Sequence, residues 1–123
     1  MAEKKSTRPF GNQGEQLAAS HLQHQGYTIV AQNWHCQYGE IDIIARQGET
    51  LVFVEVRTRH ARLTETAFES ITERKQARLV RAVQVYLAQH NLEDGPWRVD
   101  VIAIAVPPSG SPVIDHITDA LDW

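Results

Sequence analysis

The chain has 123 residues, of which 42% are hydrophobic and 22% charged, and this is the size and composition of one globular domain. Its net charge of -3 argues against a general nucleic-acid coat protein, and its single cysteine, Cys36, excludes an internal disulfide and a cysteine-rich zinc site. No segment has the roughly 18 consecutive apolar residues of a membrane span or the apolar core of a secretory signal, so we expect a cytoplasmic protein.

The first half of the chain predicts a helix followed by three strands. Residues 1–10 are polar and basic and are expected to form a flexible tail that precedes a single domain, residues 11–123. From about Asn12, the spacing of Leu17, Ala18 and Leu22 predicts an amphipathic helix that ends at Gly26. Residues 27–33 predict a strand and residues 34–38 a loop. The β-branched runs 41–45 and 51–56 flank a turn and predict a hairpin.

The second half predicts one helix and two strands. Residues 57–69 show no clear period and are expected to form an exposed loop. A helix follows and extends to about His90, with either Ser70 or Thr72 as its N-cap. Residues 97–106 and 113–117 predict strands, separated by a loop at 107–112. This order of elements indicates an α/β fold with a central mixed sheet flanked by helices.

Two acidic residues of the hairpin are the first candidates for chemistry. If the hairpin is symmetric about the bond between Gly48 and Glu49, Asp42 lies opposite Glu55, whereas a slip of one residue would separate them. The apolar residues around both acids predict strands that are buried on both faces. Because facing carboxylates repel and a buried, unpaired charge is unfavourable by several kcal/mol, a cation is expected nearby.

Two cations fit this requirement. Mg²⁺ prefers hard oxygen ligands and is commonly held by one or two carboxylates together with water and substrate phosphate. Alternatively, Arg57 forms an ion pair with Glu55 or Asp42, and the acids then have a structural role. The spacing of these residues leaves both interpretations open.

Glu15 is a third acidic candidate. It lies on the same helical face as Ala18, Ala19 and Leu22, which predicts that it points toward the sheet, within reach of a metal through water. The alternative is an ordinary acidic residue near the start of a helix, where the helix dipole favours negative charge.

Basic residues concentrate in the middle of the chain, where seven of the 12 Lys and Arg residues lie between positions 57 and 81. Lys75 is close to a helix N-terminus, where a cation opposes the helix dipole and a bound anion would relieve the repulsion. Such a cluster suits a nucleic-acid backbone, although a run of charge is more commonly a solvated face. Asp100 is interpreted as a structural partner for a nearby arginine. The candidate nucleic-acid-binding residues are Arg57, Arg59, Arg62, Arg74, Lys75 and Arg78.

Other common functional motifs are absent from the sequence. The six histidines have no metal-ligand spacing and are assigned no role, and there is no Walker A loop, dinucleotide-binding fingerprint or serine-hydrolase elbow.

A family resemblance rests on two hairpin segments. The segments GEIDIIA (39–45) and VFVEVRTR (52–59) resemble the YraN-like bacterial proteins. The resemblance extends from about residue 11 to the end of the chain. It includes Gly14-Glu15, Lys75-Gln76 and Val99-Asp100-Val101.

The YraN-like proteins in turn resemble the PD-(D/E)XK nucleases, and among them the archaeal Holliday-junction resolvases. The resemblance implies a restriction-endonuclease-like αβββαβ core and Mg²⁺- or Mn²⁺-dependent hydrolysis of phosphodiesters, in DNA rather than RNA and including branched DNA. It also implies a homodimer. The metal ligands that it implies are Asp42, Glu55 and Val56, with Glu15 in support.

The superfamily pattern has a lysine where this chain has Arg57, and a guanidinium cannot act as a general base. Arg57 is therefore expected to stabilise charge on the phosphate, and Lys75 is a candidate for the missing ammonium group. Together with Glu15, Asp42 and Glu55, they form the expected catalytic set. Two further functions remain open: a nucleic-acid-binding module that keeps the fold without efficient catalysis, and a protein-binding adaptor in which Arg57 forms a structural ion pair.

Overall fold

The computed structural model describes residues 9–121, and within them the order of elements agrees with the predicted order except for one additional short helix. The elements are α1 (Pro9–His24), β1 (Thr28–Cys36), β2 (Gly39–Gln47), β3 (Thr50–His60), α2 (Glu65–Glu69), α3 (Glu73–Gln89), β4 (Trp97–Val106) and β5 (Val113–Ile117).

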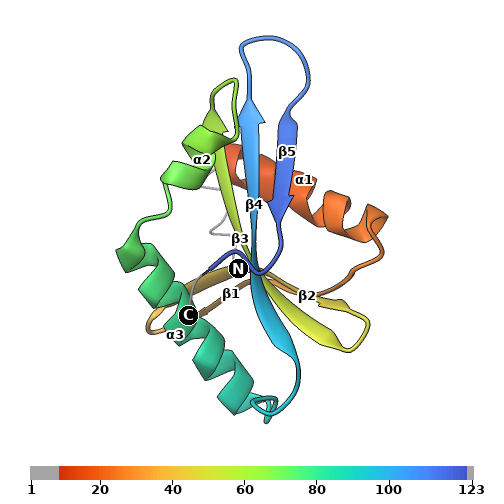
Figure 1. Cartoon of the computed structure of the whole chain (residues 1–123), viewed down its shortest axis with the longest axis vertical. Helices are drawn as coiled ribbons and strands as arrows, with labels where there is room; N and C mark the ends of the chain where they lie inside the picture. The colour runs from red at the N-terminus through yellow and green to blue at the C-terminus, as the bar shows by residue number, and fades with distance from the viewer. Residues whose placement is uncertain (1–8, 122–123) are drawn as a thin grey trace.

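The five strands form one mixed sheet in the order β1-β2-β3-β4-β5. The pair β3 and β4 is parallel, and the other three pairs are antiparallel. Helix α1 lies on one face of the sheet, whereas α2 and α3 lie on the other (Figure 1). The predicted α/β architecture, with a mixed central sheet flanked by helices, is therefore confirmed. None of the described helices is both long enough and apolar enough to cross a membrane.

Each face of the sheet has its own hydrophobic core. On the α3 face, Leu79 and Val83 of the helix pack with Phe53 and Ile44 of the sheet. On the α1 face, the core contains Ala18, Ala19, Leu22, Ile43, Val52, Val54, Ile102 and Ile104. The central strands are thus buried on both faces, as their continuous apolar runs predict.

The sheet divides into two wings at the end of the β2-β3 ladder. Pairing between these strands runs from Gln47 and Thr50 to Ile43 and Val54. Beyond that point β2 continues beside β1 to Gly39, whereas β3 continues beside β4 to its last residue. The two pairs of strands diverge in Figure 1. We call this point of divergence the fork, and the residue of β2 at the fork is Asp42.

The backbone is irregular at the fork. Asn33 of β1 has φ of +52°, and the pairs on either side of it, Gln32 with Ile43 and Trp34 with Ile41, leave it level with Asp42. Ile41 packs in the α3-face core, although Ile43, two residues later, packs in the α1-face core. The regular alternation of side chains along a β-strand therefore fails at Asp42. The change of face between Ile41 and Ile43 lies beside the left-handed backbone of Asn33 in β1. Asparagine adopts a left-handed backbone more readily than most residues.

Several predicted boundaries were wrong. Helix α1 begins at Pro9 rather than near residue 12, so residues 9 and 10 belong to the helix, and the rest of the predicted tail lies outside the described residues. Strand β1 extends to Cys36, through part of the predicted loop. The predicted loop at 57–69 was also wrong, because β3 continues to His60 in parallel register with β4 and is followed by α2. Pairing with a strand 46 residues later, as of Arg57 with Ala103, leaves no local signal in the sequence.

Candidate functional site

Asp42 lies in the fork and accepts a hydrogen bond from the β3 backbone. The Val56 amide donates to Oδ2 of Asp42 over 2.8 Å, two residues past the last residue of β3 that pairs with β2. Burial raises the pKa of Asp42 well above its usual value, and the charge of Glu55 raises it further, against a smaller lowering by the Val56 hydrogen bond. The described residues provide Asp42 with no ion pair, so its charge is poorly compensated.

Glu55 stands opposite Asp42 when the observed register, Ile43 with Val54, is extended by one residue. The hairpin is symmetric about the bond between Gly48 and Glu49, as the sequence predicts, because Gln47 pairs with Thr50. Burial raises the pKa of Glu55, while the charge of Arg57 and hydrogen bonds from Arg57 and Asp42 lower it in part. The two carboxyl groups are therefore close enough to interact directly, and both resist ionisation.

Arg57 is fixed by two side chains. Its Nη1 lies 3.3 Å from Oε2 of Glu55, and its Nε donates to Oγ of Ser70 over 2.9 Å. Ser70 in turn donates to the carbonyl of Ala67 in α2 over 2.5 Å, so the last turn of this short helix holds the guanidinium in place. Ser70 is not the cap of α3, because that position belongs to Thr72, whose hydroxyl accepts a hydrogen bond from the Lys75 amide.

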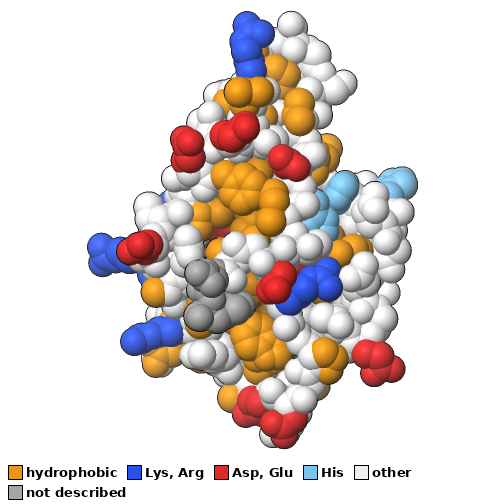
Figure 2. Space-filling view, viewed as in Figure 1, with side chains coloured by type: hydrophobic (Ala, Val, Ile, Leu, Met, Phe, Trp, Pro, Cys, Tyr) orange, Lys and Arg blue, Asp and Glu red, His pale blue; other side chains and the backbone are white. Residues whose placement is uncertain are grey.

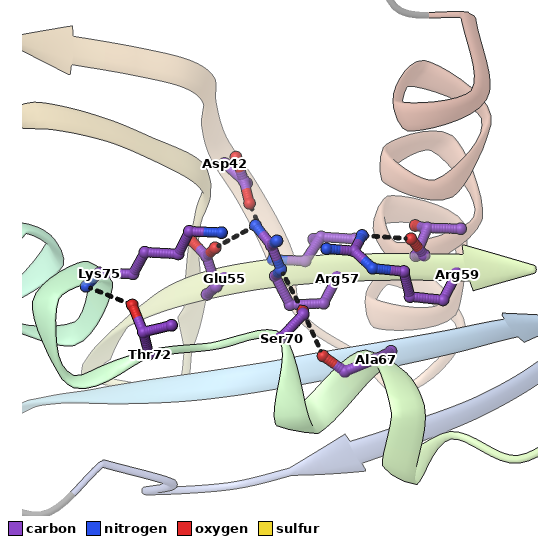
Figure 3. A network of polar contacts seen from close by, with 10 residues as sticks. Asp42, Glu55, Arg57, Arg59, Ala67, Ser70, Thr72 and Lys75 are labelled. Atoms are coloured by element: carbon purple, nitrogen blue, oxygen red, sulfur yellow. Dashed lines mark hydrogen bonds and ion pairs between the residues drawn. The ribbon is translucent and has the colours of Figure 1, made fainter.

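Lys75 approaches the carboxylates from α3. Figure 3 shows its side chain extending from the first turn of the helix toward Glu55, with Asp42 beyond. Its charge lowers the pKa of Glu55. Two elements thus bring cationic groups to Glu55: β3 a guanidinium and α3 an ammonium group.

Glu15 reaches the fork from the opposite face of the sheet. It is 9% exposed, its Oε1 accepts a hydrogen bond from Nδ2 of Asn33 over 2.9 Å, and its charge contributes to raising the pKa of Asp42. The same Nδ2 donates to Oε2 of Glu40 over 3.1 Å. Because α1 begins at Pro9, Glu15 is well inside the helix, and the alternative interpretation as a helix-start acid was wrong.

The approach of α1 to β3 depends on Gly14. A β-carbon at this position would overlap the hydroxyl oxygen of Thr58, so a larger residue would push the helix away from the strand. Thr58 is itself buried beneath the helix. Gly14 thus allows the close contact that brings the next residue, Glu15, to the fork.

The other predicted nucleic-acid-binding residues differ in their contacts and in their distance from the carboxylates. Arg59 donates from Nη1 to the carbonyl of Thr58 over 2.7 Å, and Arg62 and Arg74 are exposed. Arg78 donates to the Tyr38 carbonyl over 3.2 Å, so it also fastens the turn between β1 and β2. In Figure 2, Lys and Arg side chains protrude at the left edge of the molecule, beside α3. Several Asp and Glu side chains lie at the lower end of the molecule. Arg62 lies past the end of β3, away from the carboxylates.

Asp100 has a structural role in a separate network, as predicted. It is fully buried and accepts hydrogen bonds from Nε of Arg98 at 2.9 Å and from the amide of Asp119 at 2.9 Å. Nε2 of His116 lies 2.8 Å from its Oδ2. Burial alone would raise the pKa of Asp100, but these hydrogen bonds together lower it. His116, to which the sequence assigned no role, therefore belongs to this network.

The donor set at the fork fits a hard divalent cation. No group of three or more His, Cys, Asp or Glu side chains is arranged as a ready-made metal site within residues 9–121. Asp42 and Glu55 supply two partly buried carboxylates whose mutual repulsion a cation would relieve. Mg²⁺ commonly needs no more than this from a protein, because water and substrate phosphate complete its coordination.

Sequence reasoning missed two residues of the site, Ser70 and Asn33. Ser70 carried a signal for a helix cap, but its partner Arg57 comes from a strand that was predicted as a loop. An asparagine within a β-branched run was the available signal for left-handed backbone at position 33.

Similarity to known proteins covers almost the whole chain. The model of "Uncharacterised protein family UPF0102" matches residues 14–104. A UPF0102 protein of Chloroflexus aurantiacus is 48% identical over 110 residues, covering 89% of this chain and 88% of that protein. One from Roseiflexus castenholzii is 47% identical over 115 residues, covering 92% and 93%. One from Pseudomonas aeruginosa is 39% identical over 124 residues, covering 99% of each. The chain therefore belongs to the UPF0102 family, the YraN-like family that its hairpin segments resemble.

Proposed function

We propose that this protein is an Mg²⁺- or Mn²⁺-dependent endonuclease that hydrolyses phosphodiester bonds in DNA, built on a restriction-endonuclease-like core. The observation that carries the proposal is the partly buried pair Asp42 and Glu55 at the fork, faced by the cationic side chains of Arg57 and Lys75. Two carboxylates that resist ionisation are unfavourable for folding unless a ligand uses them, and perturbed acids of this kind concentrate at functional sites.

Each residue has a role in this proposal. Asp42 and Glu55, together with the backbone carbonyl of Val56, would hold the ion, and Glu15 supports them from α1. When bound, such an ion polarises a phosphate oxygen and makes water a stronger nucleophile at neutral pH. The guanidinium of Arg57 would stabilise negative charge on the phosphate.

Lys75 and the basic residues have different tasks. Lys75 is exposed and flexible enough to follow the phosphate or to orient water beside Glu55. Arg59, Arg74 and Arg78 lie on the strand and helix that border the site and would contact the DNA backbone, with Arg62 further along. A homodimer acting on branched DNA in the cytoplasm is part of the same proposal.

One observation favours a second function. The Glu55–Arg57 ion pair at 3.3 Å, held by Ser70, is a complete arrangement without a metal. This ion pair favours a nucleic-acid-binding module that has the fold and the charges of a nuclease but does not cleave efficiently. The same ion pair is the observation that would support a protein-binding adaptor.

A cleavage assay separates these functions. Purified protein is incubated with labelled linear, branched and single-stranded DNA and with RNA, in Mg²⁺ or Mn²⁺. Asp42→Ala and Glu55→Ala are the test variants. Glu49→Ala, at the exposed hairpin turn, is the matched control. Cleavage that Asp42→Ala and Glu55→Ala abolish and Glu49→Ala keeps supports the nuclease. DNA binding without cleavage supports the module, and the absence of both nucleic-acid and metal binding supports the adaptor.

A further inference from the structure

Asn33 touches two of the carboxylates around the fork, and its backbone conformation is unusual for a strand. Its Nδ2 donates to Glu15 over 2.9 Å and to Glu40 over 3.1 Å. The two amide hydrogens of one asparagine are thereby assigned to two acids from different elements, α1 and β2. Its φ of +52° turns the chain at the level of Asp42.

We propose that Asn33 is a positioning residue that holds Glu15 against the Asp42–Glu55 pair and so sets the metal affinity of the site. This inference rests on the proposed function. Asn33 lies level with Asp42 in the ladder between β1 and β2, and its amide contacts the carboxylates of Glu15 and Glu40. One neutral donor therefore holds two acidic side chains together beside Asp42.

Two restraints thus act on Glu15 from different sides. Gly14 brings the helix close to β3, which fixes the backbone beside Glu15. Asn33 then fixes the carboxylate end of the side chain. Without the amide, the carboxylate is free to rotate away from its neighbours toward solvent. Residues that orient metal-binding groups through hydrogen bonds typically change metal affinity by 10–100-fold when they are replaced.

The chain offers a matched pair of substitutions to test this role. Asn33→Gly removes the amide but keeps the left-handed backbone, which glycine adopts freely. Asn91→Gly is the control, because Asn91 has a nearly identical φ of +54° and lies exposed beyond the end of α3. Both variants therefore change backbone strain equally, but only Asn33→Gly loses hydrogen bonds to carboxylates.

The readout is the Mg²⁺ or Mn²⁺ concentration that gives half of the maximal rise in melting temperature, which requires no turnover. We expect Asn33→Gly to raise this concentration about tenfold or more, and Asn91→Gly to leave it unchanged. Glu15→Gln should show a similar increase, and adding Asn33→Gly to Glu15→Gln should have little further effect, because Asn33 acts through Glu15. The cleavage rate at limiting metal should follow the same order.

The outcomes distinguish this inference from the proposed function. A wild-type protein that responds to metal with a midpoint unchanged in Asn33→Gly would overturn the role of Asn33 and leave the nuclease proposal standing. Full additivity of Asn33→Gly and Glu15→Gln would also overturn it, since the two residues would then act independently. A wild-type protein with no metal response would overturn the proposed function and the role of Asn33 together.

Discussion

Replacing Asp42 by asparagine should make the metal-free protein more stable. The substitution keeps the size of the side chain and an oxygen that can accept the Val56 hydrogen bond, but it removes one of two facing charges. Glu55 loses its acidic neighbour and keeps its ion pair with Arg57 at 3.3 Å. If the site is built to bind a cation from solution, removing the repulsion between Asp42 and Glu55 stabilises the protein more than weakening the Val56 hydrogen bond destabilises it.

The size of the effect follows from the register. Directly opposed residues in an antiparallel pair have β-carbons about 5 Å apart, and two unit charges at about that separation repel by about 3 kcal/mol at an effective dielectric constant of about 20. Because pairing of β2 with β3 ends at Ile43 and Val54, this value is an upper bound for Asp42 and Glu55. Proton uptake by the pair relieves part of this repulsion, and a neutral acceptor weakens the Val56 hydrogen bond by about 1 kcal/mol. The net gain is about 1–2 kcal/mol. For 123 residues this raises the melting temperature by about 4–8 °C.

The pH dependence has a definite sign. Because the pKa of Asp42 is raised from 3.8 by burial, the folded protein binds more protons than the unfolded chain between pH 3.8 and the folded pKa. Stability of the wild type therefore falls as the pH rises through this window. The advantage of Asp42→Asn should be largest at neutral pH and should shrink as the pH approaches 4.

Urea denaturation of both proteins at pH 4 to 8, with and without Mg²⁺, measures these effects. Saturating Mg²⁺ should stabilise the wild type by about 1.4 kcal/mol at ten times the dissociation constant and should leave Asp42→Asn unchanged. Glu49→Gln, which removes the same charge at the exposed turn, is the control. Destabilisation by Asp42→Asn at neutral pH without metal would refute the reasoning and would identify Asp42 as part of a structural ion-pair network.

Three further predictions test other parts of the structure by substitution. Gly14→Ala should destabilise the fold by about 1–3 kcal/mol in urea, because its β-carbon overlaps the Thr58 hydroxyl, and Thr58→Ala should restore part of the loss. Asp100→Asn should cost about 3 kcal/mol at neutral pH, and the difference from wild type should shrink as the pH falls through the lowered pKa of Asp100; a constant difference would contradict this role. Arg57→Lys should keep DNA cleavage within about tenfold of wild type, whereas Arg57→Met should lose about 100-fold or more; equal losses would argue against a charge-stabilising role.

The hairpin and its two acids were predictable because every signal for them is local. Two runs rich in β-branched residues and a turn at Gly48, which has φ of +61°, define both strands and their register. The register alone places Asp42 opposite Glu55. The strand at 97–106 was predicted with its observed bounds for the same reason.

The surroundings of the acids were less predictable because they depend on contacts between distant segments. Strand β3 extends through residues 57–60 because β4 lies beside it, and α2 then returns to place Ser70 on Arg57. The position of Asn33 between two carboxylates depends on α1 as well as on β2. A sequence shows which residues have polar groups, but it does not show which distant partners receive their hydrogen bonds.

The arrangement of charge at the fork explains why this chain has cations on two elements. Arg57 is pinned to Glu55 and Ser70, so it neutralises one carboxylate permanently. Lys75 extends from α3 to the same carboxylate, where its charge favours ionisation of Glu55. Neither cation forms an ion pair with Asp42, whose carboxylate still lacks a countercharge. On the proposed function, a divalent ion supplies that charge, and its remaining positive charge attracts the phosphate. Metal and DNA should therefore bind cooperatively, with each increasing the affinity of the site for the other.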